Sequence, residues 1–211
     1  MKRLIIHPED HTTAFASALY EGWTDADVYN EKLTSKEVSH LFHHCSPTTQ
    51  IILVGHGSDK GLFYRKDSHT EGFDCVMVGH PHKHWLMNRH NIIGIFCNAD
   101  LFAKAEGLHG LFTGMIISEM SEAVQYGIAT SEEELTLENV KFMKRLRQLF
   151  DESCLLHEIP DRMLTLDDIH SELTKFLTSS MRHPNYYSLS VRSKSGFTAR
   201  CFSVRKRVLV K

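Results

Sequence analysis

The sequence lacks any long apolar run. No stretch approaches the length of a membrane-spanning helix, and the N-terminal "MKRLIIHPED" reaches a proline and two acids before the core of a signal peptide could form. The sequence also lacks an excess of charge of one sign, because 24 Lys and Arg residues nearly balance 26 Asp and Glu residues, which gives a formal charge of −2. We therefore expect a soluble, unsecreted protein with no membrane contact and no overall bias toward nucleic acid.

Paired cysteines are absent as well. The five cysteines are scattered and odd in number, and no two form a Cys-x-x-Cys pair, which disfavours both a disulfide framework and a zinc ribbon. A reducing, cytoplasmic location fits this pattern best. The glycine-rich "GLHGLFTG" lacks the Lys-Ser/Thr of a phosphate-binding loop, so it is interpreted as a turn into a strand. No cofactor is expected.

The motif "GHPHKHW" places His80, His82 and His84 at alternate positions. On a strand the three imidazoles would share one face and could hold zinc or nickel. No nearby acid or cysteine completes such a site, however, and Pro81 interrupts a strand. We therefore interpret the motif as a solvated loop and expect no metal.

Short apolar runs bounded by Gly, Pro or Asn indicate strands of a parallel sheet, buried on both faces. Helix-like segments separate these runs, among them "TSKEVSHLFHHC", where Thr34 and Glu37 have the spacing of a capping box. This alternation predicts a three-layer α/β/α sandwich with a mostly parallel central sheet over residues 1–130. The five expected strands are 3–7, 51–55, 75–79, 92–96 and 111–118.

The pattern changes after Gly127, and residues 131–211 are expected to form a C-terminal extension packed on the first domain. Helices are predicted over about 132–150 and 165–181, followed by a β-hairpin over about 186–210. The hairpin is rich in Lys and Arg beside aromatic residues, which could bind nucleic acid. The favoured alternative is that it docks on the acidic segment 151–172 of this chain or of a partner.

Two chemically reactive side chains follow two of these strands directly. His56 comes after "IILVG" and Cys97 comes after "IIGIF". Catalytic groups in open parallel sheets gather outside the carboxyl ends of the strands. If the two strands are neighbours, about 5 Å apart, the thiol and the imidazole share one rim. His56 could then act as general base and Cys97 as nucleophile.

Acyl transfer also needs donors for the oxyanion. The backbone N–H groups of Gly57 and Cys97 are the candidates, and the absence of a side chain at Gly57 would admit a substrate carbonyl. Each residue also has a structural interpretation, since His-Gly after a strand is usually a turn and free cysteine is often buried. Their joint position at strand ends favours the functional interpretation.

The stretches "ILVGHGSDKGLF" and "IIGIFCNAD" together resemble the caspase-like (clan CD) cysteine peptidases, the group of caspases, metacaspases, clostripain, gingipains and bacterial CHAT proteases. The resemblance covers about residues 1–130. It implies the caspase-like fold and a cysteine endopeptidase acting on a peptide or protein substrate, with His56 as base, Cys97 as nucleophile, and the amides of Gly57 and Cys97 as oxyanion hole. The arginine and glycine that follow the caspase cysteine are absent, so an aspartate specificity is not implied.

Three further polar residues are expected on the same rim. Asp100, Ser118 and Glu119 could line a pocket, where a carboxylate would favour a basic substrate residue. Capping of a helix N-terminus is the favoured role for Asp100. The alternative function is a non-catalytic caspase-like scaffold that binds a protein or nucleic-acid partner through its C-terminal extension. The sequence leaves the oligomeric state open.

Overall fold

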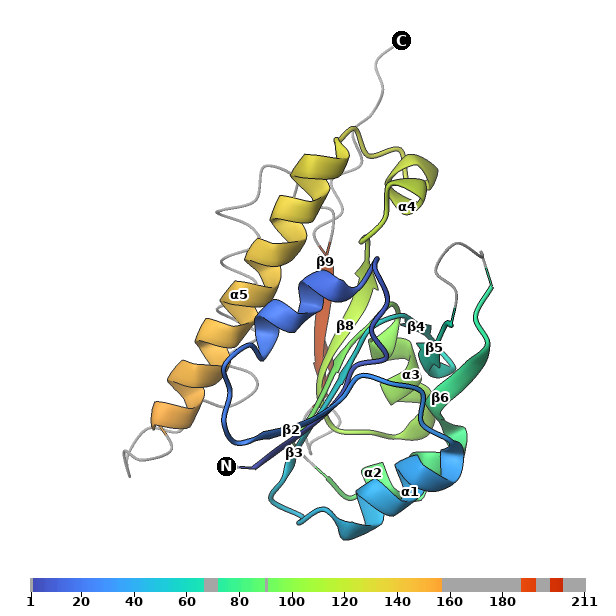
Figure 1. Ribbon diagram of the computed structural model, residues 1–211, viewed down its shortest axis with the longest axis vertical. Coiled ribbons are helices and arrows are strands. Elements are labelled where there is room, and N and C mark those ends of the chain that lie inside the picture. The colour runs from blue at the N-terminus through green and yellow to red at the C-terminus, as the bar shows by residue number, and fades with distance from the viewer. Residues whose placement is uncertain (1, 67–71, 90, 157–186, 193–197, 203–211) are drawn as a thin grey trace.

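The structure, a computed structural model, describes residues 2–66, 72–89, 91–156, 187–192 and 198–202. Its centre is a sheet in the order β10-β9-β8-β7-β3-β1-β2. The five strands β2, β1, β3, β7 and β8 run parallel, and β9 and β10 pair antiparallel beyond β8 (Figure 1). Their bounds are β1 Arg3–Ile6, β2 Ala26–Tyr29, β3 Gln50–Val54, β7 Ile92–Ile95, β8 Gly110–Ile116, β9 Tyr187–Arg192 and β10 Thr198–Phe202.

Helices cover both faces of this sheet. On one face the 3-10 helix η1 (Ala14–Leu19) packs with α5 (Glu132–Leu156), and on the other lie α1 (Ser35–His44), α2 (Lys83–Leu86) and α3 (Ala99–Glu106) (Figure 1). Successive residues of β3 alternate between the two cores, because Ile52 and Val54 face α5 whereas Ile51 and Leu53 face α1. The predicted α/β architecture with a mostly parallel sheet is confirmed.

One of the five expected strands is placed differently. The run 75–79 forms β6 (Cys75–Gly79), which pairs antiparallel with β5 (Gly61–Tyr64) in a separate sheet of order β4-β5-β6. In the central sheet β3 already has β1 and β7 as neighbours, so the chain leaving β3 turns back through β4 (Gly57–Ser58) into a local hairpin. The apolar run 75–79 is compatible with a strand in either the central sheet or the small sheet.

The strand β2 was not predicted from the sequence. It lies at the edge of the sheet, and two of its four residues, Asp27 and Val28, are exposed, so no continuous apolar run marks it. By contrast, the capping box of α1 is confirmed. The backbone N–H of Glu37 donates to Thr34 Oγ1 at 3.3 Å, and the backbone N–H of Thr34 donates to Glu37 Oε2 at 2.7 Å.

The expected C-terminal elements lie partly outside the described residues. Helix α5 covers the predicted 132–150 and continues to Leu156, whereas the predicted helix 165–181 falls outside the described ranges. Strands β9 and β10 occupy the region of the predicted hairpin, whose residues 186, 193–197 and 203–210 also lie outside the described ranges. Within the described ranges, no helix combines the length and apolar character needed to cross a bilayer.

Candidate functional site

His56 and Cys97 follow two neighbouring strands at equivalent positions. Strands β3 and β7 pair in parallel with Val54 opposite Ile95, and each of the two residues lies two positions beyond its strand's member of that pair. Both side chains line one cavity of about 20 Å³, which has room for about one water molecule. The remaining lining residues are Thr13, Phe15, Ala16, Val54, Gly55, Ile95, Ile116, Ser118 and Met143.

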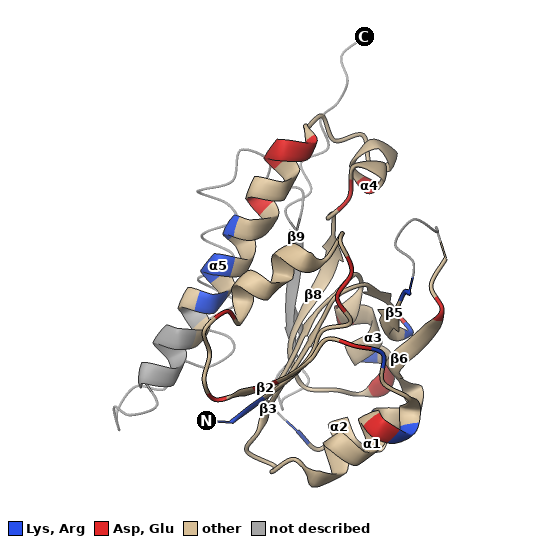
Figure 2. Cartoon of the chain, in the orientation of Figure 1, with Lys and Arg blue, Asp and Glu red and all other residues tan. Residues whose placement is uncertain are grey.

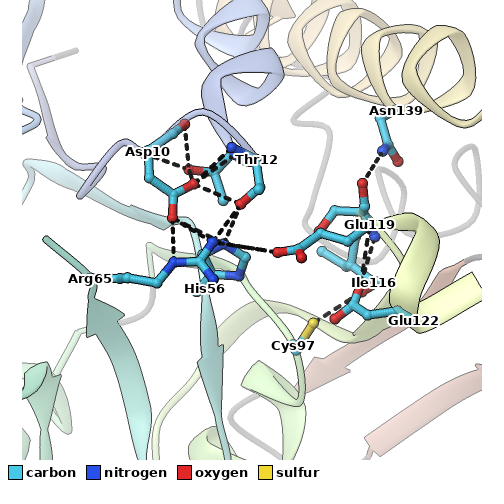
Figure 3. A network of polar contacts seen from close by, with 11 residues as sticks. Asp10, Thr12, His56, Arg65, Cys97, Ile116, Glu119, Glu122 and Asn139 are labelled. Carbon is cyan, nitrogen blue, oxygen red and sulfur yellow. Dashed lines mark hydrogen bonds and ion pairs between the residues drawn. The ribbon is translucent and has the colours of Figure 1, made fainter. Parts of the chain in front are cut away.

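The thiol of Cys97 is held in its neutral form. Its Sγ donates a hydrogen bond to the backbone carbonyl of Ile116, at 3.0 Å, across the end of β8 (Figure 3). Burial, reinforced by the nearby carboxyl of Glu122, raises the pKa of the Cys97 thiol to about 12. A neutral thiol is a poor nucleophile, so Cys97 is not activated in this arrangement.

The imidazole of His56 is nearly buried and takes part in a network of polar side chains (Figure 3). Its Nε2 lies 2.7 Å from Thr12 Oγ1, 3.2 Å from Arg65 Nη2, 3.4 Å from Asp10 Oδ2 and 3.6 Å from Glu119 Oε1. Four side chains from other parts of the chain therefore surround the Nε2 atom of His56.

Asp10 and Arg65 form the buried ion pair at the centre of this network. The Arg65 Nε and Nη2 atoms lie 2.9 and 2.8 Å from Asp10 Oδ2, and both side chains are under 10% exposed, at 6% and 7%. Burial disfavours the ionised carboxyl, but hydrogen bonds from His56, Thr12 and Arg65 outweigh it and hold the pKa of Asp10 well below its ordinary value. Asp10 is therefore a carboxylate at neutral pH.

Sequence reasoning missed Asp10, Thr12 and Arg65. The first two follow β1, which pairs with β3, so the strand-end logic that selected His56 also applies to them. Arg65 had no comparable signal, because it follows β5 of the small sheet and reaches the rim only through the fold.

The packing around Gly57 leaves no room for a side chain. A Cβ atom at this position would lie 2.3 Å from the Phe96 ring and 2.5 Å from the carbonyl oxygen of Gly61. Close packing therefore requires the missing side chain, and the admission of a substrate carbonyl at Gly57 stays a prediction. Gly61 is also constrained, since its φ of +125° and the nearby Val78 carbonyl exclude a larger residue as β5 begins.

The structure brings Ser118 and Glu119 to the site, whereas Asp100 is not among the residues that line the cavity. Ser118 lines the cavity beside Cys97, and Glu119 lies 3.5 Å from Arg65 Nη2. Asp100 lies in the first turn of α3, after Asn98, which has a left-handed φ of 59° and makes no side-chain cap. A negative side chain in the first turn interacts favourably with the helix dipole, although Asp100 is not the N-cap residue itself.

A larger groove of about 550 Å³ adjoins the network. Its walls come from the loop before η1, from the segment joining β8 to α4 (Met120–Gln125), and from α5. It shares Thr12, Ser118 and Glu119 with the site, and its charged lining residues are Glu119 and Glu132. Figure 2 shows acidic residues at the end of α5 nearest α4, so this side of the groove is negative.

The three histidines of "GHPHKHW" do not form a strand face. Residues 80–82 make the turn η2 and α2 follows directly, so Pro81 ends the strand as expected. The predicted solvated loop is wrong for His82, which is 1% exposed and accepts the backbone N–H of Gly79 at Nδ1. His80 instead pairs with Glu106. Among the described residues, no group of three His, Cys, Asp or Glu side chains could hold a metal ion.

No protein-family model matches the chain, and a search of curated proteins finds no match either.

Proposed function

We propose that this protein is a caspase-like cysteine endopeptidase in which Cys97 is the nucleophile and His56 the general base. The observation that carries the proposal is the equivalent position of the two residues past the paired strands β3 and β7, on one shared cavity. A thiol and an imidazole on the carboxyl edge of a parallel sheet are the two groups that thiol-based acyl transfer requires.

The reaction begins when the proton of Cys97 passes to His56. The resulting thiolate attacks the peptide carbonyl, and the protonated imidazole then donates to the leaving amine. Backbone N–H groups at Gly57 and Cys97 are the proposed donors to the oxyanion. In the resting position, a pKa of about 12 makes ionisation of the thiol cost about 7 kcal/mol at pH 7. Cys97 must therefore leave the Ile116 carbonyl before it reacts.

The adjoining groove is the proposed substrate site. Its volume of about 550 Å³ suits a few residues of an extended peptide, and Phe15, Leu135 and Val140 provide apolar contact. Because its charged lining residues are Glu119 and Glu132, a basic peptide side chain is favoured there. Movement of the segment between Ile116 and Glu119 would free the thiol and reshape this groove together.

The test combines cleavage of a mixed peptide library with labelling by a peptidyl acyloxymethyl ketone, followed by mass spectrometry. We expect cleavage and modification at Cys97, with both lost in Cys97→Ala and cleavage reduced at least a hundredfold in His56→Ala. Cys45→Ala is the matched control, because Cys45 is also a half-buried free cysteine but lies at the end of α1. Cleavage that survives in Cys97→Ala would refute the assignment.

A non-catalytic scaffold is the second candidate, and the hydrogen-bonded, neutral thiol of Cys97 favours it. In that case the protein would bind a partner through the proposed C-terminal extension. His56→Ala and Cys97→Ala would then change the stability of the protein but no activity. Failure of every electrophile to label Cys97 in the folded protein would support this second candidate.

A further inference from the structure

The hydroxyl group of Thr12 lies at the centre of the network around His56. Its Oγ1 is 2.7 Å from Asp10 Oδ1, 2.7 Å from His56 Nε2 and 2.9 Å from Arg65 Nη2 (Figure 3). A hydroxyl has one proton to donate and two lone pairs with which to accept. Three short contacts therefore use its full capacity, and the location of each proton can be worked out.

Two of the three partners have fixed roles. The carboxylate of Asp10 only accepts, so the Thr12 proton points to Asp10 Oδ1. The guanidinium of Arg65 only donates, so it occupies one lone pair of Thr12. The second lone pair remains for His56, and the 2.7 Å contact is a hydrogen bond only if His56 Nε2 carries a proton.

The opposite tautomer fails this accounting. With a bare Nε2, both His56 and Asp10 would compete for the single Thr12 proton, and one 2.7 Å contact would join two acceptors. The surrounding carboxylates, Asp10 Oδ2 at 3.4 Å and Glu119 Oε1 at 3.6 Å, also favour a proton on Nε2. Arg65 Nη2, at 3.2 Å, opposes it, but this is the longest of the contacts among His56, Thr12 and Arg65.

The orientation of Asp10 is itself fixed. Its Oδ2 is held by two nitrogens of Arg65, at 2.9 and 2.8 Å, which turns Oδ1 toward the loop that follows it. There Oδ1 also accepts the backbone N–H groups of Thr12 and Thr13, at 2.9 and 3.1 Å. The acceptor that sets the direction of the Thr12 hydroxyl therefore cannot rotate away.

We propose that Asp10 and Thr12 are positioning residues that fix His56 in the tautomer protonated on Nε2, leaving the lone pair of Nδ1 as the proton acceptor. This assignment of a base nitrogen rests on the proposed function. When the S–H bond of Cys97 breaks, its proton forms an N–H bond at Nδ1 and the electron pair stays on sulfur. The Nε2–H hydrogen bond to Thr12 is kept throughout, so the imidazolium is stabilised without rearrangement.

The direct test is the tautomer of His56, measured by nitrogen and carbon NMR of protein with labelled histidine at a pH where the ring is neutral. A spectrum of His56→Gln identifies the resonances by difference. We expect the Nε2–H form in the wild-type protein and in Thr12→Ser, which keeps the hydroxyl. We expect a mixture or the Nδ1–H form in Thr12→Val, which has nearly the same shape without a hydroxyl.

A wild-type His56 protonated on Nδ1, or a Thr12→Val spectrum identical to that of wild type, would overturn the proposal. Activity adds a second readout, since Thr12→Val should lower kcat tenfold or more with little change in KM, and Thr12→Ser should restore it. If the Nε2–H form is found but no peptide is cleaved, the positioning role stands and the proposed function fails. If cleavage depends on Cys97 but the tautomer is Nδ1–H, the proposed function stands and the positioning role fails.

Discussion

The reactivity of the Cys97 thiol follows directly from its environment. With a pKa of about 12, caused by burial and the neighbouring Glu122, about one molecule in 10⁵ carries the thiolate at pH 7. An unperturbed cysteine with a pKa near 8.5 is about 3% thiolate, roughly 3,000-fold more. A more basic thiolate is intrinsically about 40-fold more nucleophilic, by a Brønsted slope of 0.4–0.5. The net expectation is a reaction about a hundredfold slower, before the partial burial of the thiol slows it further.

The assay is reaction with a small aromatic disulfide, with each cysteine quantified by mass spectrometry. The same Cys97 in the urea-unfolded chain supplies the reference rate, so sequence context cancels. The folded protein should react at least a hundredfold more slowly at pH 7. Its rate should still rise about tenfold per unit above pH 9, where the unfolded reference levels off. Equal or faster reaction of folded Cys97 would refute the geometry in which the Ile116 carbonyl accepts the thiol proton.

Two further predictions concern stability. Asp10→Ala leaves the buried guanidinium of Arg65 without its main partner and should lower the free energy of unfolding by about 3 to 5 kcal/mol, measured by urea denaturation. His7 is fully buried, and burial lowers its pKa to about 4, so the unfolded chain binds a proton near pH 6.5 that the folded protein refuses. Stability should therefore fall by about 2 kcal/mol between pH 7.5 and 5, and His7→Gln should remove that part of the slope.

Matched variants separate these effects from general damage. Glu138→Ala breaks the exposed ion pair with Lys141 and should cost less than about 1 kcal/mol. A cost as small for Asp10→Ala would contradict the importance of the buried pair. His84→Gln removes an exposed histidine and should leave the pH slope as in wild type. If His7→Gln leaves it equally unchanged, His7 does not carry the acid sensitivity.

Much of the fold could be predicted because burial leaves a mark on local sequence. Strands β1, β3, β7 and β8 are buried on both faces and appear as continuous apolar runs. The same signal misplaced β6, since an apolar run does not say which sheet it joins. It missed β2, whose edge position exposes polar residues.

The candidate site divides along the same line. The sequence by itself determined that a histidine and a cysteine each follow a buried strand, because strand ends are local features. Only the tertiary structure decided that these strands are neighbours, that the thiol bonds to Ile116, and that Asp10, Thr12 and Arg65 surround His56. These contacts join residues up to 46 positions apart, as Asp10 and His56 are. Their protonation states depend on burial and on partners that no local pattern encodes.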